Sequence, residues 1–168
     1  MSQFWRPRSG RGVLAAALVL ILAGAPQALA EETWPHPGTN VFATSKSFDD
    51  LWAKLETAIG AHGMGIVGRA SASRGAAARG VSIPGNAVIG VYRNDFAVRM
   101  LEASVAAGIE APLRFYLYET GDGGATLVYR SPSAVFAPYG SATLDAMAHE
   151  LDALFAAIAR DATGATGD

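Results

Sequence analysis

The segment from Arg114 to Pro132, RFYLYETGDGGATLVYRSP, constrains the fold more than any other part of the sequence. Two runs rich in aromatic and aliphatic residues flank the stretch GDGG. Glycine and aspartate are the residues that tight turns between antiparallel strands favour. The segment therefore predicts a β-hairpin with its turn at 121–124, and at least part of the sheet must be antiparallel.

Both faces of this hairpin carry large side chains, although the exposed face of a half-buried hairpin is usually polar. Because side chains alternate along a strand, one face consists of Phe115, Leu117, Leu127 and Tyr129. The other, here called the arginine face, consists of Arg114, Tyr116, Tyr118, Val128 and Arg130. In a register centred on Asp122, Tyr116 faces Val128 and Arg114 faces Arg130. Directly opposed like charges destabilise a strand pair by up to ~1 kcal/mol unless something bridges them.

Patterns on both sides of the hairpin predict further strands and helices. Strands are expected at 41–46, 64–69 and 87–92, and the stretch 71–80 is a short helix or a loop. Ser47 precedes a helix with an apolar stripe from Phe48 to Ile59, and a second helix follows Asn94 to about Ala107. Apolar residues recur at three and four positions through 143–162, which predicts a long C-terminal helix.

The order of these elements predicts a single α+β domain over residues 41–162. One tight hairpin makes the sheet at least partly antiparallel, and the helices should pack on one of its faces. Residues 31–40 are predicted to be a loose leader, because they contain two prolines and a glycine without periodicity. Residues 163–168 are predicted to be a disordered tail.

The first thirty residues have the three parts of a secretory signal peptide. Arg6, Arg8 and Arg11 are basic, an apolar run follows at 13–23, and Ala28-Leu29-Ala30 is a small-x-small cleavage site. The apolar run is shorter than the ~20 residues that a membrane span needs. We therefore expect cleavage after Ala30, export to the periplasm or the medium, and no membrane contact after cleavage.

The expected mature chain of 138 residues is acidic and contains no cysteine. All fifteen acidic residues follow Ala30, but three of the thirteen basic residues precede it, so the mature net charge is −5. This charge argues against nucleic acid or an anionic membrane surface as a partner. Without cysteine, an exported chain has neither disulfides nor thiolate chemistry.

The stretch from Val88 to Pro132 resembles the middle of domain-of-unknown-function family 302. The resemblance is carried by Asn94 at a strand end, the step Ala111-Pro112-Leu113 into the hairpin, and Tyr129 with Pro132 at its close. It extends over roughly 41–162. It implies a curved antiparallel sheet backed by helices, of the TATA-binding-protein-like class, and it implies no established activity.

The sequence departs from this family's pattern at two places. Many members have Asp-His where this chain has Arg69-Ala70-Ser71, and often Gly-Asn-Pro where it has Arg93-Asn94-Asp95. A role that rests on that histidine or that proline is therefore not carried over to this chain.

The implied fold suggests why both faces of the hairpin carry large side chains. If helices cover the first face, the arginine face is left for another partner. Arginine forks suit carboxylates and phosphates, and Tyr and Arg are enriched at interfaces. An anionic ligand or a second copy of the chain could therefore bind there. Alternatively, Glu110 or Glu119 pairs with each arginine, or both guanidiniums point into water.

A second candidate site is the cluster of Arg93, Asn94 and Arg99 at a helix start, where an anion could bind. The alternative is an Asn94 cap and an ion pair between Asp95 and Arg99. A carrier or enzyme built on this cluster would need a cleft facing the loop 133–139.

The histidines are a weaker candidate for a site. Asp145, His149 and Asp152 share a helix face and could hold a metal, although a solvated His–Asp pair is the commoner arrangement. A metal or haem accessory role would require His149 or His62 as a ligand. His36 lies in the expected leader, and three scattered histidines do not predict a site.

These observations favour an exported, non-catalytic module that binds a ligand or associates with itself. No nucleophile elbow, phosphate loop or metal motif is recognisable, so no cofactor and no metal are expected. The alternative is a small periplasmic enzyme or carrier that acts on an anionic metabolite.

Overall fold

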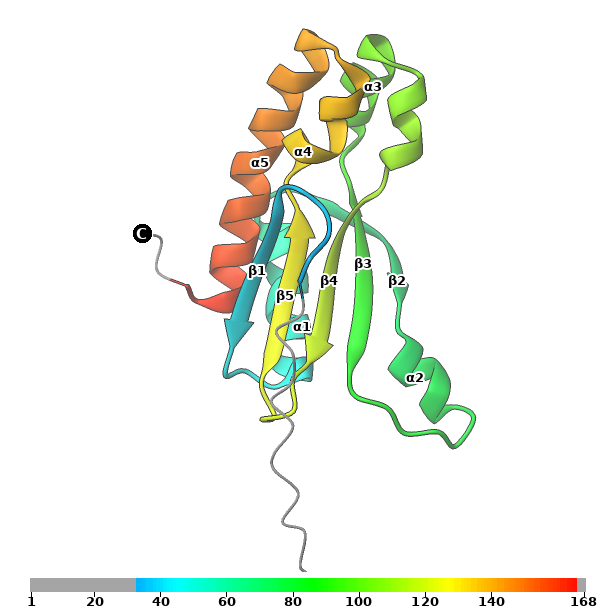
Figure 1. Ribbon diagram of the computed structural model, residues 1–168, viewed down its shortest axis with the longest axis vertical. Coiled ribbons are helices and arrows are strands. Elements are labelled where there is room, and N and C mark those ends of the chain that lie inside the picture. Colours follow the sequence, from blue (N-terminus) through cyan, green and yellow to red (C-terminus); the bar gives the residue numbers. More distant parts are fainter. Residues whose placement is uncertain (1–32, 166–168) are drawn as a thin grey trace, which may run out of the picture. The chain divides into compact units, whose positions relative to one another are not determined.

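The computed structural model describes residues 33–165, and its sheet has five strands (Figure 1). Each strand is antiparallel to its neighbours, in the order β1-β5-β4-β3-β2. The bounds are β1 Thr39–Thr44, β2 Gly65–Ala70, β3 Asn86–Tyr92, β4 Leu113–Glu119 and β5 Ala125–Arg130. The hairpin β4–β5 therefore lies inside the sheet, with β1 and β3 as its outer neighbours.

The longest helices, α1 and α5, lie behind the sheet in Figure 1 and cover one of its faces. The helices are α1 Phe48–Ala61, α2 Ala72–Ala77, α3 Asn94–Ala103, α4 Pro132–Phe136 and α5 Ala142–Thr163, with 3₁₀ turns η1 Ala106–Glu110 and η2 Ala137–Tyr139. None of the helices in this part of the chain is long and apolar enough to cross a membrane. The single α+β domain, the antiparallel sheet backed by helices and the long C-terminal helix are confirmed.

Serine caps begin the two long helices. Ser47 Oγ accepts a hydrogen bond from the Asp50 amide at 3.2 Å, and Ser141 Oγ accepts one from the Leu144 amide at 3.3 Å. Each cap satisfies an amide that the first turn of a helix leaves without a partner.

The main core is an aromatic stack between the hairpin and α5. Phe155 stacks on Phe115 at 4.6 Å between ring centroids and lies 5.6 Å from Tyr129. Phe115 and Phe155 are completely buried. Because these rings come from β4, β5 and α5, they hold the C-terminal helix against the middle of the sheet.

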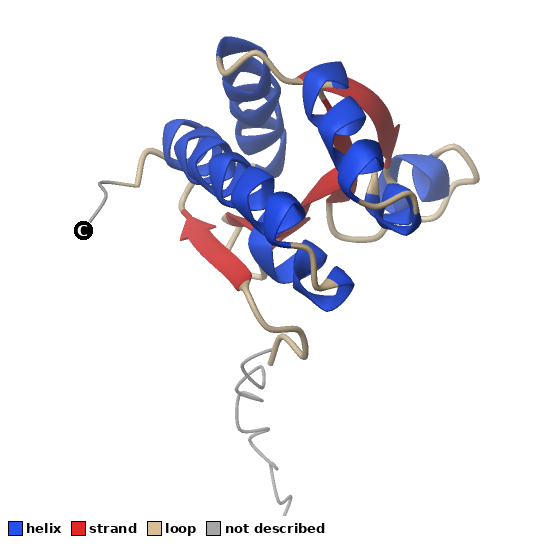
Figure 2. Cartoon of the chain, turned by 90° about the horizontal axis from the view of Figure 1, so that it is seen from above, coloured by secondary structure: helices blue, strands red, loops and turns tan. Residues whose placement is uncertain are grey.

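A second apolar cluster lies at one end of the sheet, where α3, η1 and α4 meet the first half of α5. Figure 2 looks down on this end, with helices in front of the strands. Phe96, Phe136 and Leu144 are buried in it. The cluster positions α4 and η1 beside the arginine ends of β4 and β5.

The structure differs from the sequence predictions at both ends of the domain. Strand β1 begins at Thr39, and the chain from Trp34 onward packs as part of the domain, so residues 34–40 are not a loose leader. Helix α5 includes Thr163 and ends at Gly164 with φ 73°, so the predicted tail begins too early. Residues 166–168 and the predicted signal peptide at 1–30 lie outside the described residues.

Replacing Phe155 with alanine tests the aromatic stack. We expect Phe155→Ala to lower the free energy of unfolding by about 3–5 kcal/mol, because it removes a fully buried ring from a packed core. Urea unfolding followed by circular dichroism measures this change. The control Leu101→Ala removes a half-exposed side chain from α3 and should cost ~1 kcal/mol or less. Equal losses in the two variants would contradict the assigned core.

Candidate functional site

The hairpin has the register that the sequence predicts. Tyr116 pairs with Val128 and Phe115 pairs with Tyr129, which places Arg114 and Arg130 at the next position along the same two strands. Helices α1 and α5 cover the opposite face. The arginine face therefore points away from the main core, although Val128 on it is 4% exposed and nearly buried.

The segment 34–38, here called the leader, covers part of the arginine face. The Trp34 ring lies 6.5 Å from Tyr116 and 6.3 Å from Tyr118, measured between centroids. Tyr116 and Tyr118 also stack on each other at 5.6 Å. Three aromatic rings therefore close one end of this face, with two of them from β4 and one from the leader.

Hydrogen bonds to the end of β5 hold the leader in place. The Ser131 amide donates to the Gly38 carbonyl at 2.7 Å, and the Asn40 side chain donates to Gly38 O at 3.0 Å and to Ser131 Oγ at 2.9 Å. The Thr39 hydroxyl donates to the His36 carbonyl at 2.8 Å. The two bonds to Ser131 join segments about ninety residues apart in the sequence.

Gly38 meets two local requirements of this junction. Its φ is 71°, a left-handed conformation that residues with a Cβ rarely adopt. A Cβ at this position would also collide with the side chain of Ala134 in α4. Glycine at 38 therefore allows the leader to turn closely over α4 and return across the sheet.

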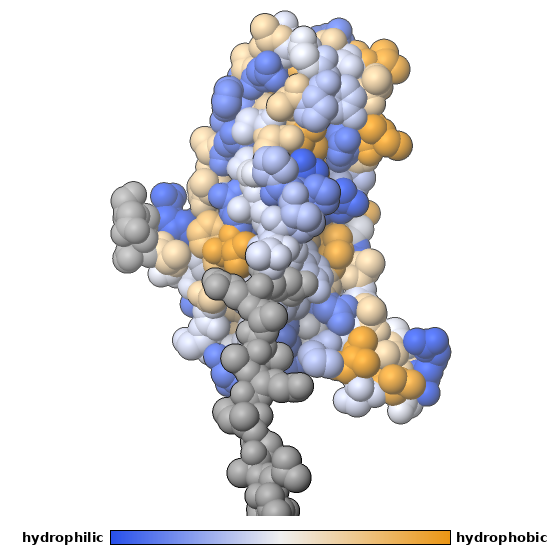
Figure 3. Space-filling view, viewed as in Figure 1, coloured by the Kyte–Doolittle hydropathy of each residue, from blue (hydrophilic) through white to orange (hydrophobic). Residues whose placement is uncertain are grey.

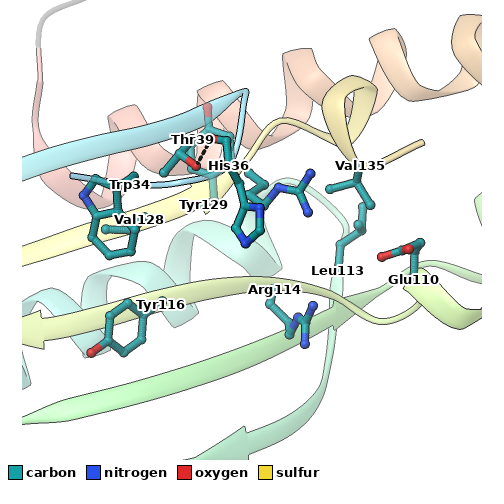
Figure 4. A pocket seen from close by; sticks show the side chains of 11 residues that line it. Trp34, His36, Thr39, Glu110, Leu113, Arg114, Tyr116, Val128, Tyr129 and Val135 are labelled. Atoms are coloured by element: carbon teal, nitrogen blue, oxygen red, sulfur yellow. Dashed lines mark hydrogen bonds between the residues drawn. The ribbon is translucent and has the colours of Figure 1, made fainter. Parts of the chain in front are cut away.

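A cavity of about 280 Å³ lies between the leader and the arginine face. We call it the leader pocket (Figure 4). Trp34, Tyr116 and Val128 lie at one end of it, and Glu110, Leu113 and Val135 at the other. The side chains of His36 and Arg114 lie between these ends. Arg130, Thr39 and Tyr129 complete the lining.

Among residues 33–165, neither arginine of this pocket forms an ion pair. Arg130 Nε is buried and has no hydrogen-bond partner in this part of the chain, and Arg130 Nη2 reaches only the Ala134 carbonyl at 3.4 Å. A buried donor without a partner is costly. The pocket therefore presents two positively charged guanidiniums to a ligand, and the buried N–H at Arg130 Nε is available to donate a hydrogen bond to it.

The two glutamates that the sequence offers as partners for these arginines form hydrogen bonds with other groups. Glu110 accepts a hydrogen bond from the Tyr139 hydroxyl at 3.0 Å, and Glu119 accepts one from the Gly85 amide at 2.7 Å. The pKa of Tyr139 is raised, first by burial and then by the hydrogen bond to Glu110. The predicted alternative, in which each arginine pairs with one of these glutamates, is therefore not observed.

The second predicted cluster is separate from the leader pocket. Arg93 binds both carboxylate oxygens of Asp95, at 2.8 and 3.0 Å, and Arg99 binds both of Glu150, at 2.8 and 2.7 Å. Each guanidinium lowers the pKa of the carboxyl that it binds. Both charges of this cluster are therefore already matched by carboxylates.

The Asn94 helix start also differs from its predicted form. Arg93 occupies the cap position of α3 without a side-chain cap bond, and Asn94 accepts a hydrogen bond from the Tyr92 hydroxyl at 3.3 Å. The nearby cavity, which Phe96 and Phe136 help to line, measures only about 30 Å³. This space, about the size of one water molecule, is too small for a metabolite.

The other histidines pair with aspartates. His62 Nε2 lies 2.8 Å from Asp161 Oδ2, and His149 Nδ1 lies 3.3 Å from Asp152 Oδ2. The second oxygen of Asp152 accepts a hydrogen bond from the Ser133 amide in α4. Within the described residues, no group of three or more His, Cys, Asp or Glu side chains is placed to hold a metal ion.

Sequence reasoning did not place Trp34 and His36 in the site. Both belong to the sequence TWPHPG, which has no periodicity and therefore gave no indication of where its side chains lie. An aromatic residue and a histidine between prolines, next to an aromatic-rich hairpin, were the available signal. The structure brings them onto the arginine face through the turn at Gly38.

Comparisons with known proteins identify the family and the fold of the domain but not an activity. Residues 41–161 match the model of the family described as "Domain of unknown function DUF302". A crystal structure of an uncharacterized conserved DUF302 protein from Bacillus stearothermophilus has a similar fold, with a TM-score of 0.66 and 16% sequence identity. The alignment covers 74% of this chain and 98% of that protein. A search of curated proteins finds no match.

Replacing Gly38 with alanine tests the anchoring of the leader. We expect Gly38→Ala to release the leader, because the new Cβ collides with Ala134 in addition to straining the backbone. In a ¹⁵N–¹H spectrum of the chain from Glu31, the indole signal of Trp34 should move and that of Trp52 should not.

Gly140→Ala is the matched control. Gly140 also has a positive φ, 61°, but no atom lies within 4 Å of the position that a Cβ would take. This variant should keep the Trp34 signal in place. An unchanged Trp34 signal in Gly38→Ala would contradict the packing of the leader on the hairpin.

Proposed function

We propose that this chain, which belongs to the DUF302 family of domains of unknown function, is an exported protein that binds a small anionic ligand in the leader pocket. One observation carries the proposal. Two arginines face the same cavity without a carboxylate partner in the described part of the chain, and one of them has a buried Nε without a hydrogen bond. A bound anion would bridge the two positive charges and satisfy the buried donor.

The chemistry of the pocket supports a carboxylate or a phosphate as the charged group. Guanidinium groups present planar pairs of N–H donors that match these oxyanions. Arg130 lies partly buried beside Val128 and Tyr129, where water screens its charge less than at an open surface. The exposed Arg114 gives the anion a route from solvent.

The polar groups around the cavity favour binding over catalysis. Among the described residues, the His36 ring forms no hydrogen bond with a hydroxyl that it could activate as a nucleophile. Catalysis by such a pair requires the base within hydrogen-bond reach of the nucleophile. The alternative, an enzyme or carrier anchored by Arg93, Asn94 and Arg99, has less support because both of its arginines already bind carboxylates.

Self-association through the arginine face is the second proposal that the sequence suggests, and it has less support than ligand binding. The leader lies over that face within the same chain, so a second copy could not stack flat on it. The two most exposed large apolar side chains of the described residues lie elsewhere, with Val105 79% and Ile109 82% exposed. Figure 3 shows orange side chains over the α3 and η1 end, away from the leader.

Substitutions of the two pocket arginines test the proposal. We expect Arg114→Gln and Arg130→Gln each to weaken the binding of a carboxylate or phosphate probe about tenfold or more, because each removes a charged hydrogen-bond donor. Isothermal titration calorimetry with acetate, phenylacetate and inorganic phosphate measures the change. Arg114→Glu should abolish binding of these anions while the melting temperature stays within a few degrees.

Arg99→Gln is the control for a general loss of positive charge. It removes one arginine from the surface but leaves the leader pocket intact, so anion affinity should stay within about twofold. Native mass spectrometry of the same samples reports assembly. A dimer that Arg114→Glu dissociates, with no anion bound to the wild type, would replace ligand binding with self-association as the role of this face.

Export is tested separately by the N-terminus of the protein. The basic, apolar and small-residue parts of residues 1–30 support a cleaved signal peptide. When the full chain is expressed in a bacterium, we expect the periplasmic fraction to contain a product that begins at Glu31. Replacing both Ala28 and Ala30 with large residues should leave the precursor uncleaved. A full-length product in the cytoplasm would contradict the proposed export.

A further inference from the structure

The leader pocket is lined by residues from inside and from outside the region that matches the family model. The family match covers residues 41–161, which include Arg114 and Arg130. Trp34 and His36 come from the segment before the match, yet they line the same cavity. The two arginines therefore lie inside the matched region, and the leader residues that form the opposite wall lie outside it.

The chemistry of the pocket changes along its length. At one end, the rings of Trp34 and Tyr116 lie beside the side chain of Val128 (Figure 4). The edge-to-face angle between these two rings is 65°, and Tyr118 stacks behind Tyr116. Aromatic rings attract one another in such edge-to-face and offset arrangements, and the pocket-facing sides of Trp34 and Tyr116 offer the same contacts to a ligand ring. This end of the pocket therefore suits a flat, apolar group.

The middle of the pocket suits a single negative charge next to that group. Arg114 and His36 lie between the aromatic end and the Glu110 end in Figure 4. The carboxyl of Glu110 would repel a second anionic group at the far end, and such like-charge contacts oppose binding strongly. The pocket therefore favours a ligand with one anionic end over a dianion.

We propose that the leader pocket binds an aromatic monocarboxylate and that Trp34 in the leader decides this preference. The carboxylate binds Arg114 and Arg130, and the ring packs against the pocket-facing sides of Trp34 and Tyr116. This inference rests on the proposed function, since it requires the arginines to bind an anion. It adds the class of ligand and the residue that selects it.

A cavity of this size matches the proposed class. A volume of about 280 Å³ lies near the lower end of the range for small-molecule sites. It accommodates a single ring with a short carboxylate arm. A larger polycyclic ligand would have to displace the leader from its hydrogen bonds to Ser131 and Asn40.

Affinities of matched probes for the chain from Glu31 test this inference. Phenylacetate and acetate carry the same charge and differ in the ring, and phenylacetamide keeps the ring without the charge. Calorimetry should show phenylacetate binding about tenfold or more tighter than acetate, because the ring becomes buried. Phenylacetamide and inorganic phosphate should both bind more weakly than phenylacetate.

Variants at position 34 test whether Trp34 causes the preference for phenylacetate over acetate. Trp34→Ala should remove most of the advantage of phenylacetate over acetate while leaving acetate affinity within about twofold. Trp34→Phe should restore most of that advantage, because it returns an aromatic surface. The Trp34→Phe variant also separates lost stacking from a displaced leader, since the phenyl ring keeps the leader packed on Tyr116.

The outcomes distinguish a failure of this inference from a failure of the proposed function. If phenylacetate and acetate bind equally well and Arg114→Gln weakens both, the pocket binds anions but the aromatic preference is wrong. If the preference persists in Trp34→Ala, the leader does not select the ligand. If no probe binds the wild type, the proposed function fails together with this inference.

Discussion

The packing of Phe155 against Phe115 and Tyr129 is the interaction on which the rest of this structure depends. It places the C-terminal helix across the middle of the hairpin, and it decides which hairpin face is buried. Because strand side chains alternate with a period of two, burying Phe115 and Tyr129 turns Arg114 and Arg130 to the other side of the sheet. The same choice leaves the two tyrosines of β4 outside the core. The candidate site is therefore a consequence of how the core packs.

The leader is the second element that shapes the site. An antiparallel sheet with helices on one face presents a large open face, and the two arginines on it would otherwise be surrounded by water. The leader returns over this face, packs Trp34 on the tyrosines and encloses a cavity above the arginines. Enclosure matters because a charge pair is stronger where less water screens it. A flat cationic surface thus becomes a pocket that we propose to be selective.

The ion pairs of the surface show why only one of the two arginine clusters is a candidate site. Arg93 and Arg99 each face a carboxylate with two oxygens in reach, and both also lie over the ring of Phe96, at 4.2 and 5.3 Å. The Arg99–Glu150 pair joins α3 to the N-terminal half of α5. Arg114 and Arg130 have no such partner in the described part of the chain. The guanidiniums of Arg93 and Arg99 therefore stabilise the fold, and those of Arg114 and Arg130 are available for binding.

Local structure could be predicted from the sequence: the hairpin with its register, the capped first helix, the long last helix and the α+β class. Each of these depends on turn chemistry or on a period of 2 or 3.6 residues, which neighbouring residues carry. The contacts of the site could not be predicted and follow from the packing of the whole domain: His36 and Trp34 meet Arg114 and Arg130, Arg99 binds Glu150, and Glu110 binds Tyr139. These partners lie far apart in the sequence and carry no periodic signal. Their meeting depends on how the packed core brings the leader, η1 and α5 together in space.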